Sequence, residues 1–102
     1  MSNWIEVGNI DEIPVLGARV VNYGNKRIAV FRNREDDIFA INDECPHRKG
    51  FLSQGIVHNS TVTCPMHNWK IDLQTGEAQA PDEGCTGHYA VKLEEHTIFI
   101  DV

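Results

Sequence analysis

The chain has 102 residues, 41% hydrophobic and 24% charged, and this composition predicts a single globular domain over residues 1–102. Nine Lys and Arg against fifteen Asp and Glu give a net charge of −6, so the chain lacks the basic excess that binding to nucleic acid requires. No apolar run approaches the ~20 residues that span a bilayer, and residues 1–14 lack the basic segment of a secretory signal, so we expect a cytoplasmic protein without membrane association.

Short apolar runs bounded by turn signals recur along the chain and predict an all-β domain with little helix. A short helix is expected only at residues 9–12, where Pro14 stops it, and a turn near residues 82–84. Strands are predicted at residues 4–7, 18–21, 27–32, 38–41, 61–63, 69–73, 89–93 and 97–100. The last two strands form a hairpin around residues 94–96.

Two short motifs carry the chemistry, namely Cys45-Pro46-His47 and Cys64-Pro65-Met66-His67, with sixteen residues between them. Each motif follows a predicted strand and supplies one thiolate and one imidazole. An asymmetric binuclear iron–sulfur centre needs this set, because one iron takes two thiolates and the other takes two imidazoles. The proline after each cysteine biases that cysteine toward extended conformations, which suits a stiff loop leaving a strand. The predicted metal ligands are therefore Cys45, His47, Cys64 and His67.

Two other interpretations of these four residues stay open. Two cysteines and two histidines could bind one tetrahedral Zn²⁺, although zinc modules more often space both ligands of a pair by two or more residues. A Cys–His pair could also serve as nucleophile and base, but this leaves two ligand-like residues without a role.

The remaining chemistry-bearing side chains are expected to be structural or solvated. Cys85 has no predicted chemistry, because a leftover cysteine is usually a small buried hydrophobe. Trp4 and Trp69 are interpreted as packing residues. The histidines expected to be exposed to solvent are His58, His88 and His96.

The chain resembles the Rieske [2Fe-2S] family, whose motif is C-x-H, about sixteen residues, then C-x-x-H. The likeness covers essentially the whole chain and includes Thr75-Gly76 after the second motif. It implies antiparallel sheets with a small subdomain of two cluster-binding loops, at about residues 43–72. It also implies one Rieske-type [2Fe-2S] cluster per chain, with Cys45 and Cys64 on the inner iron and His47 and His67 on the outer iron.

Within this family, the runs Asn-Trp-Lys-Ile at residues 68–71 and Pro-Asp-Glu-Gly-Cys at residues 81–85 resemble the small subunit of NAD(P)H-dependent assimilatory nitrite reductase. That resemblance implies a one-electron carrier without a catalytic centre of its own. Its large partner subunit would carry FAD, a [4Fe-4S] cluster and siroheme, and would reduce nitrite to ammonium. Phe51 and the Gly87-His88 pair depart from this pattern and bear on subunit contacts rather than on cluster binding.

Two alternative roles accompany this interpretation. The free-standing ferredoxins of aromatic-ring dioxygenases also resemble the chain, but they usually carry glycine at the position of Asn68. A structural or assembly subunit with a non-essential cluster is the other alternative. The basic residues Arg48, Lys49 and Lys70 lie beside the ligands in sequence and could steer an acidic redox partner.

High-potential Rieske proteins of respiratory complexes add one cysteine to each loop and join the loops by a disulfide. This sequence has Gly50 and Met66 at those positions. The serine and tyrosine that donate hydrogen bonds to the cluster in those proteins are replaced by Trp69 and Ile71. The resemblance therefore implies a low reduction potential.

Overall fold

The computed structural model describes residues 3–43, 51–64, 69–78, 84 and 86–102. In this part of the chain, ten strands and two single-turn 3-10 helices are present, and all strand pairs are antiparallel. The strands are β1 (Trp4–Asn9), β2 (Ala18–Tyr23), β3 (Lys26–Arg32), β4 (Ile38–Asn42), β5 (Ile56–His58), β6 (Thr61–Thr63), β7 (Lys70–Asp72), β8 (His88–Tyr89), β9 (Val91–Glu94) and β10 (Thr97–Asp101). The helices are η1 (Ile10–Glu12) and η2 (Leu52–Gln54). Neither helix has the length or apolar character to cross a membrane.

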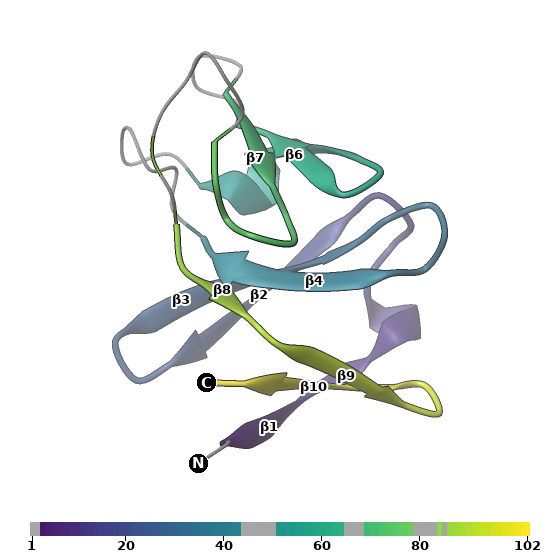
Figure 1. The fold of residues 1–102 in the computed structure, drawn as a ribbon. Helices are drawn as coiled ribbons and strands as arrows, with labels where there is room; N and C mark the ends of the chain where they lie inside the picture. Colours follow the sequence, from purple (N-terminus) through teal and green to yellow (C-terminus); the bar gives the residue numbers. More distant parts are fainter. Residues whose placement is uncertain (1–2, 44–50, 65–68, 79–83, 85) are drawn as a thin grey trace.

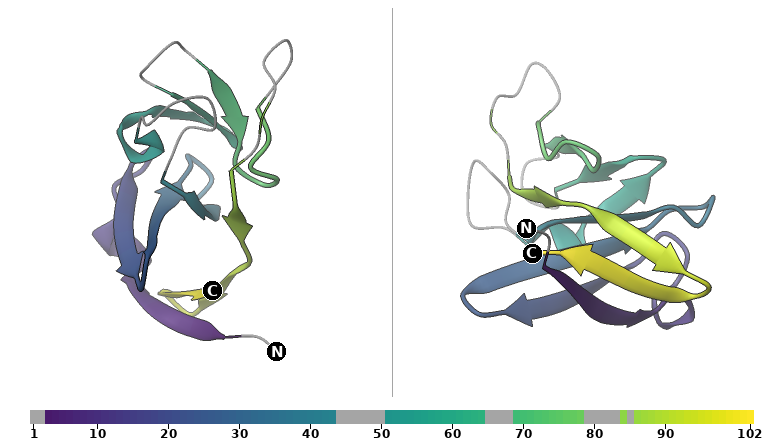
Figure 2. Two further views of the ribbon diagram at one scale, coloured as in Figure 1. Left: turned by 90° about the vertical axis from the view of Figure 1, so that its left-hand side faces the viewer. Right: turned by 60° about the horizontal axis from the view of Figure 1, so that its bottom comes forward.

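The strands form three sheets, and the predicted all-β fold is confirmed. The sheet β2-β3-β4-β8 lies between the sheet β5-β6-β7 and the sheet β1-β10-β9 (Figure 1; Figure 2). Two separate apolar cores fill the spaces between these layers. The central sheet therefore contributes side chains to a core on each of its faces.

The run Ile28-Ala29-Val30-Phe31 in β3 explains this layering. All four residues are completely buried. Successive side chains of a strand point to opposite faces, so Ile28 and Val30 belong to the core shared with β10, whereas Ala29 and Phe31 belong to the core shared with β6 and β7. In the sequence, a strand that is buried on both faces appears as a continuous apolar run and not as an alternation of apolar and polar residues.

The neighbouring strand β4 follows the same rule. Ile38 and Ala40 join one core, while Ile41 joins the other. The upper core, defined as the core between the central sheet and β5-β6-β7, comprises Ala29, Phe31, Ile41, Leu52, Val57, Val62, Cys64, Ile71 and Leu73. The predicted cysteine ligand Cys64 is thus part of the hydrophobic core.

Two elements differ from the prediction. Residues 89–93 were predicted as one strand, but Ala90 separates β8, which pairs with β4, from β9, which pairs with β10. The chain changes sheets at this residue, and the Asp101 N–H donates to the Ala90 carbonyl at 3.0 Å. The strand β5 was not predicted, because in a run of three residues only Val57 is buried.

The short helix predicted at residues 9–12 is confirmed as η1. Asn9 caps it, since the Asn9 Oδ1 accepts the Asp11 N–H at 2.9 Å. Short turns at residues 24–25 and 34–35 join β2 to β3 and β3 to β4.

The burial of Phe31 makes a prediction about stability. Phe31→Ala should lower the free energy of unfolding by about 3–5 kcal/mol, because it leaves a cavity in the upper core. Phe51→Ala is the matched control, since Phe51 is 45% exposed, and should cost under ~1 kcal/mol. Urea denaturation followed by circular dichroism measures both, and equal losses would contradict the packing described here.

Candidate metal centre

Cys64 is the one predicted ligand that the described residues include; Cys45, His47 and His67 lie outside them. So do Cys85, Arg48, Lys49, Gly50, Met66 and Asn68, which the sequence also singled out. The site is therefore built from Cys64 and from the described residues that flank the two motifs.

Cys64 directly follows β6 and is completely buried. Its N–H donates to the Trp69 carbonyl at 2.6 Å. This contact extends the β6–β7 pairing by one step beyond Thr63 and Lys70, so residues 65–68 connect two strand ends that are held together. The prediction that the second cysteine follows a strand is confirmed.

The first motif is anchored by a carboxylate that the sequence analysis did not identify. Asp43 follows β4, and its side chain is completely buried. The carboxylate accepts the Ser53 backbone N–H at 2.6 Å, the Ser53 hydroxyl at 2.9 Å and the Arg27 Nε–H at 2.8 Å. Since Asp43 precedes residues 44–50 and Ser53 follows them, these contacts join the two ends of the first motif's segment.

Arg27 is the third member of this group, and we call Asp43, Ser53 and Arg27 together the Asp43 anchor. The Asp43 N–H donates to the Arg27 carbonyl at 2.8 Å, so backbone and side chain of both residues interact. The Arg27 guanidinium also lies 4.2 Å from the centroid of the Phe51 ring, within the range of a cation–π contact. In the sequence, the only sign of this anchor is that residues 42–44, directly before Cys45, are polar. That local pattern does not indicate that Arg27 and Ser53 are the partners of Asp43.

The edge strand β8 is fixed against the end of β4 by a second polar contact. The Tyr89 hydroxyl donates to the Asn42 Oδ1, and the Asn42 N–H donates to the Gly87 carbonyl at 2.7 Å. Burial raises the pKa of the Tyr89 phenol above its ordinary value of 10.0. The hydroxyl therefore stays a neutral donor throughout the physiological range.

A tight turn at Gly76 brings residues 76 and 86 together. Gly76 has a φ of +78°, and a side-chain Cβ on it would lie only 2.1 Å from the Thr86 carbonyl oxygen. The Thr86 N–H donates to the Gly76 carbonyl at 2.7 Å, and Ala78 bridges to Ile71 of β7. A residue other than glycine would clash here, which accounts for the Thr75-Gly76 sequence.

The segments that contain the two motifs therefore leave neighbouring sheets that share one core. Asp43 directly follows β4 of the central sheet, and Cys64 directly follows β6 of the sheet β5-β6-β7. Both strands contribute to the upper core. A buried thiol at this place, shielded from water by apolar side chains, fits an iron–sulfur cluster, because soft thiolates and a hydrophobic shell are what such clusters require.

Other predictions about individual side chains can be compared with the structure. The histidines His58, His88 and His96 are exposed, as predicted. Trp69 is partly buried and packs against the upper core, which confirms its packing role. Trp4 is instead 37% exposed and lies under the Lys92 ammonium, 4.9 Å from the ring centroid. The prediction for Trp4 was wrong, because Ile5 and Val7 occupy the face of β1 that packs against a core, and Trp4 lies on the other face.

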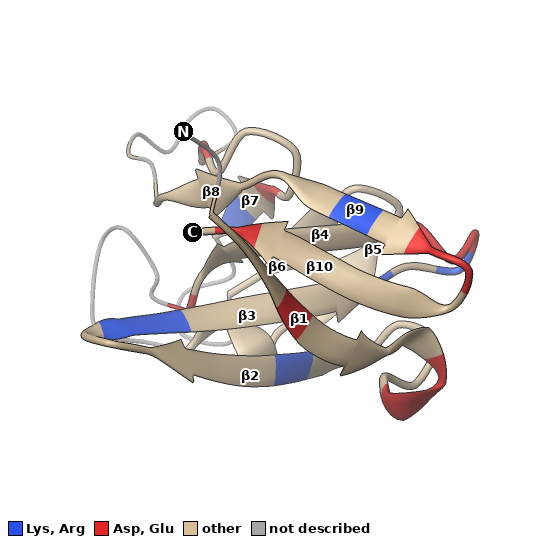
Figure 3. Cartoon of the chain, turned by 90° about the horizontal axis from the view of Figure 1, so that it is seen from below, with Lys and Arg blue, Asp and Glu red and all other residues tan. Residues whose placement is uncertain are grey.

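Charges are distributed unevenly over the described residues. Figure 3 shows basic residues at the start of β3, while acidic residues gather around η1 and the turn between β9 and β10. The start of β3 adjoins the end of β4, since Ile28 pairs with Asn42. Lys26 and Arg27 thus lie at the end of the central sheet from which the first motif continues.

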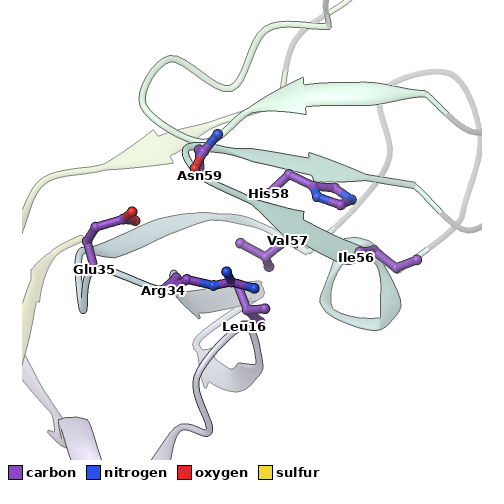
Figure 4. Close-up of a pocket in the computed structure, with 7 residues that line it drawn as sticks. All are labelled: Leu16, Arg34, Glu35, Ile56, Val57, His58 and Asn59. Atoms are coloured by element: carbon purple, nitrogen blue, oxygen red, sulfur yellow. The ribbon is translucent and has the colours of Figure 1, made fainter.

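A surface pocket of about 390 Å³ lies elsewhere (Figure 4). Residues from β5 and from the turns after η1, β3 and β5 line it, namely Leu16, Arg34, Glu35, Ile56, Val57, His58 and Asn59. It includes neither Cys64 nor the Asp43 anchor. The pocket is therefore separate from Cys64 and from the described residues that flank the first motif.

Comparison with known proteins decides the family. A protein-family model described as the Rieske [2Fe-2S] domain matches residues 3–95. The chain belongs to the Rieske [2Fe-2S] family. This Rieske domain carries a Rieske-type [2Fe-2S] cluster and is an electron carrier. When bound, the cluster takes up and releases one electron at a time.

This Rieske domain is similar to proteins whose names refer to different enzyme systems. The anthranilate 1,2-dioxygenase ferredoxin subunit of Burkholderia cepacia is 35% identical over 105 residues, covering 100% of this chain and 94% of that protein. The ferredoxin of carbazole 1,9a-dioxygenase from Nocardioides aromaticivorans IC177 has a TM-score of 0.86 at 22% identity, covering 96% of each chain. A Mycobacterium tuberculosis protein assigned as an NADH-dependent nitrite reductase small subunit has a TM-score of 0.89 at 18% identity, covering 100% of this chain and 96% of that one. At these identities the two structures establish the fold alone.

The side chains near Cys64 predict a low reduction potential for this Rieske domain. Ile71 is completely buried and has no hydroxyl to donate to a sulfur. The midpoint should therefore lie in the lower half of the ~−150 to +300 mV range of Rieske centres. Anaerobic redox titration measures it, and a midpoint in the upper half of the range would contradict the prediction.

Proposed function

We propose that this Rieske domain is the electron-transfer small subunit of an NAD(P)H-dependent nitrite reductase. The observation that carries this proposal is the pair of runs at residues 68–71 and 81–85, which resemble that subunit. In this role the chain has no catalytic centre of its own. It passes single electrons to or from a large flavin- and siroheme-containing subunit that reduces nitrite.

The proposed cluster ligands are Cys45, His47, Cys64 and His67. Two thiolates and two imidazoles satisfy the asymmetric ligation of a Rieske cluster. The buried position of Cys64 supports its assignment to the inner iron. The Asp43 anchor supports the first motif, because it joins the residues on either side of Cys45 and His47. The ligand loops then span about residues 43–72 of a single domain over residues 1–102.

The ligand assignment predicts the outcome of single substitutions. Replacing Cys45 or Cys64 by Ser, or His47 or His67 by Ala, should each abolish cluster assembly, because every ligand is needed for the asymmetric centre. Cys85→Ser is the matched control and should leave the cluster intact. Wild type should contain two irons and two acid-labile sulfides per chain after anaerobic purification. One zinc and no sulfide would instead support the tetrahedral Zn²⁺ interpretation.

A second candidate function is the ferredoxin component of an aromatic-ring oxygenase. A specific observation favours it, since the 35% identical relative is a dioxygenase ferredoxin subunit, and the match covers 94% of its length. The carrier chemistry is the same in both roles. The identity of the redox partner therefore distinguishes them.

Reconstitution with purified partners tests the two roles. With a siroheme-containing nitrite reductase large subunit, we expect the wild-type chain to support NAD(P)H-driven nitrite reduction. The His67→Ala variant should bind that subunit but fail to restore turnover, because it lacks the cluster. Equal turnover by wild type and variant would favour the structural or assembly role. Failure to bind the siroheme subunit, together with reduction of an aromatic-ring oxygenase by the wild-type chain, would favour the ferredoxin role.

A further inference from the structure

The Asp43 anchor bears on two properties of the cluster site, namely the position of the first ligand loop and the reduction potential. We propose that Asp43 is a positioning residue for the first ligand loop, and that its buried negative charge lowers the reduction potential of the cluster. The inference rests on the proposed assignment of Cys45 as a ligand. It does not depend on which redox partner the chain serves.

The geometry of the anchor carries the positioning role. One carboxylate binds the backbone N–H and the hydroxyl of Ser53, at 2.6 and 2.9 Å, although nine residues lie between Asp43 and Ser53 in the sequence. Hydrogen bonds to a charged acceptor are stronger than those between neutral groups. Ser53 belongs to η2, which is held in place by the completely buried Leu52. A single side chain therefore ties Asp43, which precedes residues 44–50, to Ser53, which follows them, at the edge of the core.

The charges of the anchor differ in their exposure to solvent. The Asp43 side chain is completely buried, whereas the Arg27 side chain is 45% exposed. Water screens the exposed part of the cation, while a buried charge acts through a medium of lower dielectric constant. The field of the carboxylate at the first loop is therefore only partly compensated. A negative charge close to a cluster opposes the uptake of an electron, and local net charge is one of the properties that set the potential.

The chain offers a matched control at the opposite end of β3. Arg32 forms an ion pair with Asp36 at 2.8 Å, and the Asp36 side chain is 56% exposed. Arg27 and Arg32 are five residues apart on one strand, which corresponds to ~17 Å. Asp43→Asn and Asp36→Asn thus each remove one negative charge from an Arg–Asp ion pair, a buried carboxylate at the proposed anchor and an exposed one away from it.

The experiment uses the full chain, purified anaerobically with its cluster. Asp43→Asn keeps the shape of the side chain and an oxygen that can accept the Ser53 N–H, but removes the charge. We expect its midpoint potential to rise above that of wild type, and we expect Asp36→Asn to match wild type. Loss of cluster to an iron chelator should also be faster for Asp43→Ala than for Asp36→Ala, because the loop ends are no longer joined.

A second variant keeps the test decisive if Asp43→Asn fails to assemble a cluster. Arg27→Gln removes the cation and leaves the carboxylate, so its midpoint should fall below that of wild type, with Arg32→Gln as control. A purely structural role would not shift the potential in opposite directions for the two partners of one ion pair. Shifts of the same sign, or wild-type potentials and wild-type chelation rates in the Asp43 variants, would overturn the proposal. A wild-type chain without iron and sulfide would instead refute the ligand assignment.

Discussion

The double-sided burial of β3 and β4 is the constraint on which the rest of this structure depends. Two adjacent strands without a solvent-exposed face need a second layer on each side, because every apolar side chain must leave water. The core between the central sheet and the sheet β1-β10-β9 is closed by β1 and β10, which come from the two ends of the chain. The upper core is closed by β5, β6 and β7, the sheet that contains Cys64. The layer that completes the core is thus also the layer that supplies a proposed cluster ligand.

This arrangement separates rigid support from the chemistry. Cys64 and Asp43 lie where β6 and β4 end, and both are completely buried. One is held by the β6–β7 pairing, and the other holds the ends of the first motif through Ser53 and Arg27. Side chains carried by packed strands are positioned more accurately than side chains on free loops. A carrier that changes only its charge benefits from such rigidity, because little structural rearrangement accompanies electron uptake.

The sequence predicted the fold class, most strands, η1 and the family, because these follow from local patterns such as the apolar run at residues 28–31 and the spacing of the two motifs. Three features of the structure could not be predicted from the sequence. The break at Ala90 depends on which sheets its neighbours join, and β5 is too short to show a period. The ion pair between Arg27 and Asp43 depends on β3 and β4 being adjacent and in one register, which no local pattern specifies.

The central claim is that this chain carries a cluster with two chemically different irons, one bound by thiolates and one by imidazoles. Mössbauer spectroscopy of anaerobically purified chain, grown on isotopically enriched iron, tests it most directly. We expect two distinct iron sites in equal amounts, with the added electron localised on the histidine-bound iron after reduction. A single type of iron site, or equivalent irons with all-sulfur ligation, would contradict it.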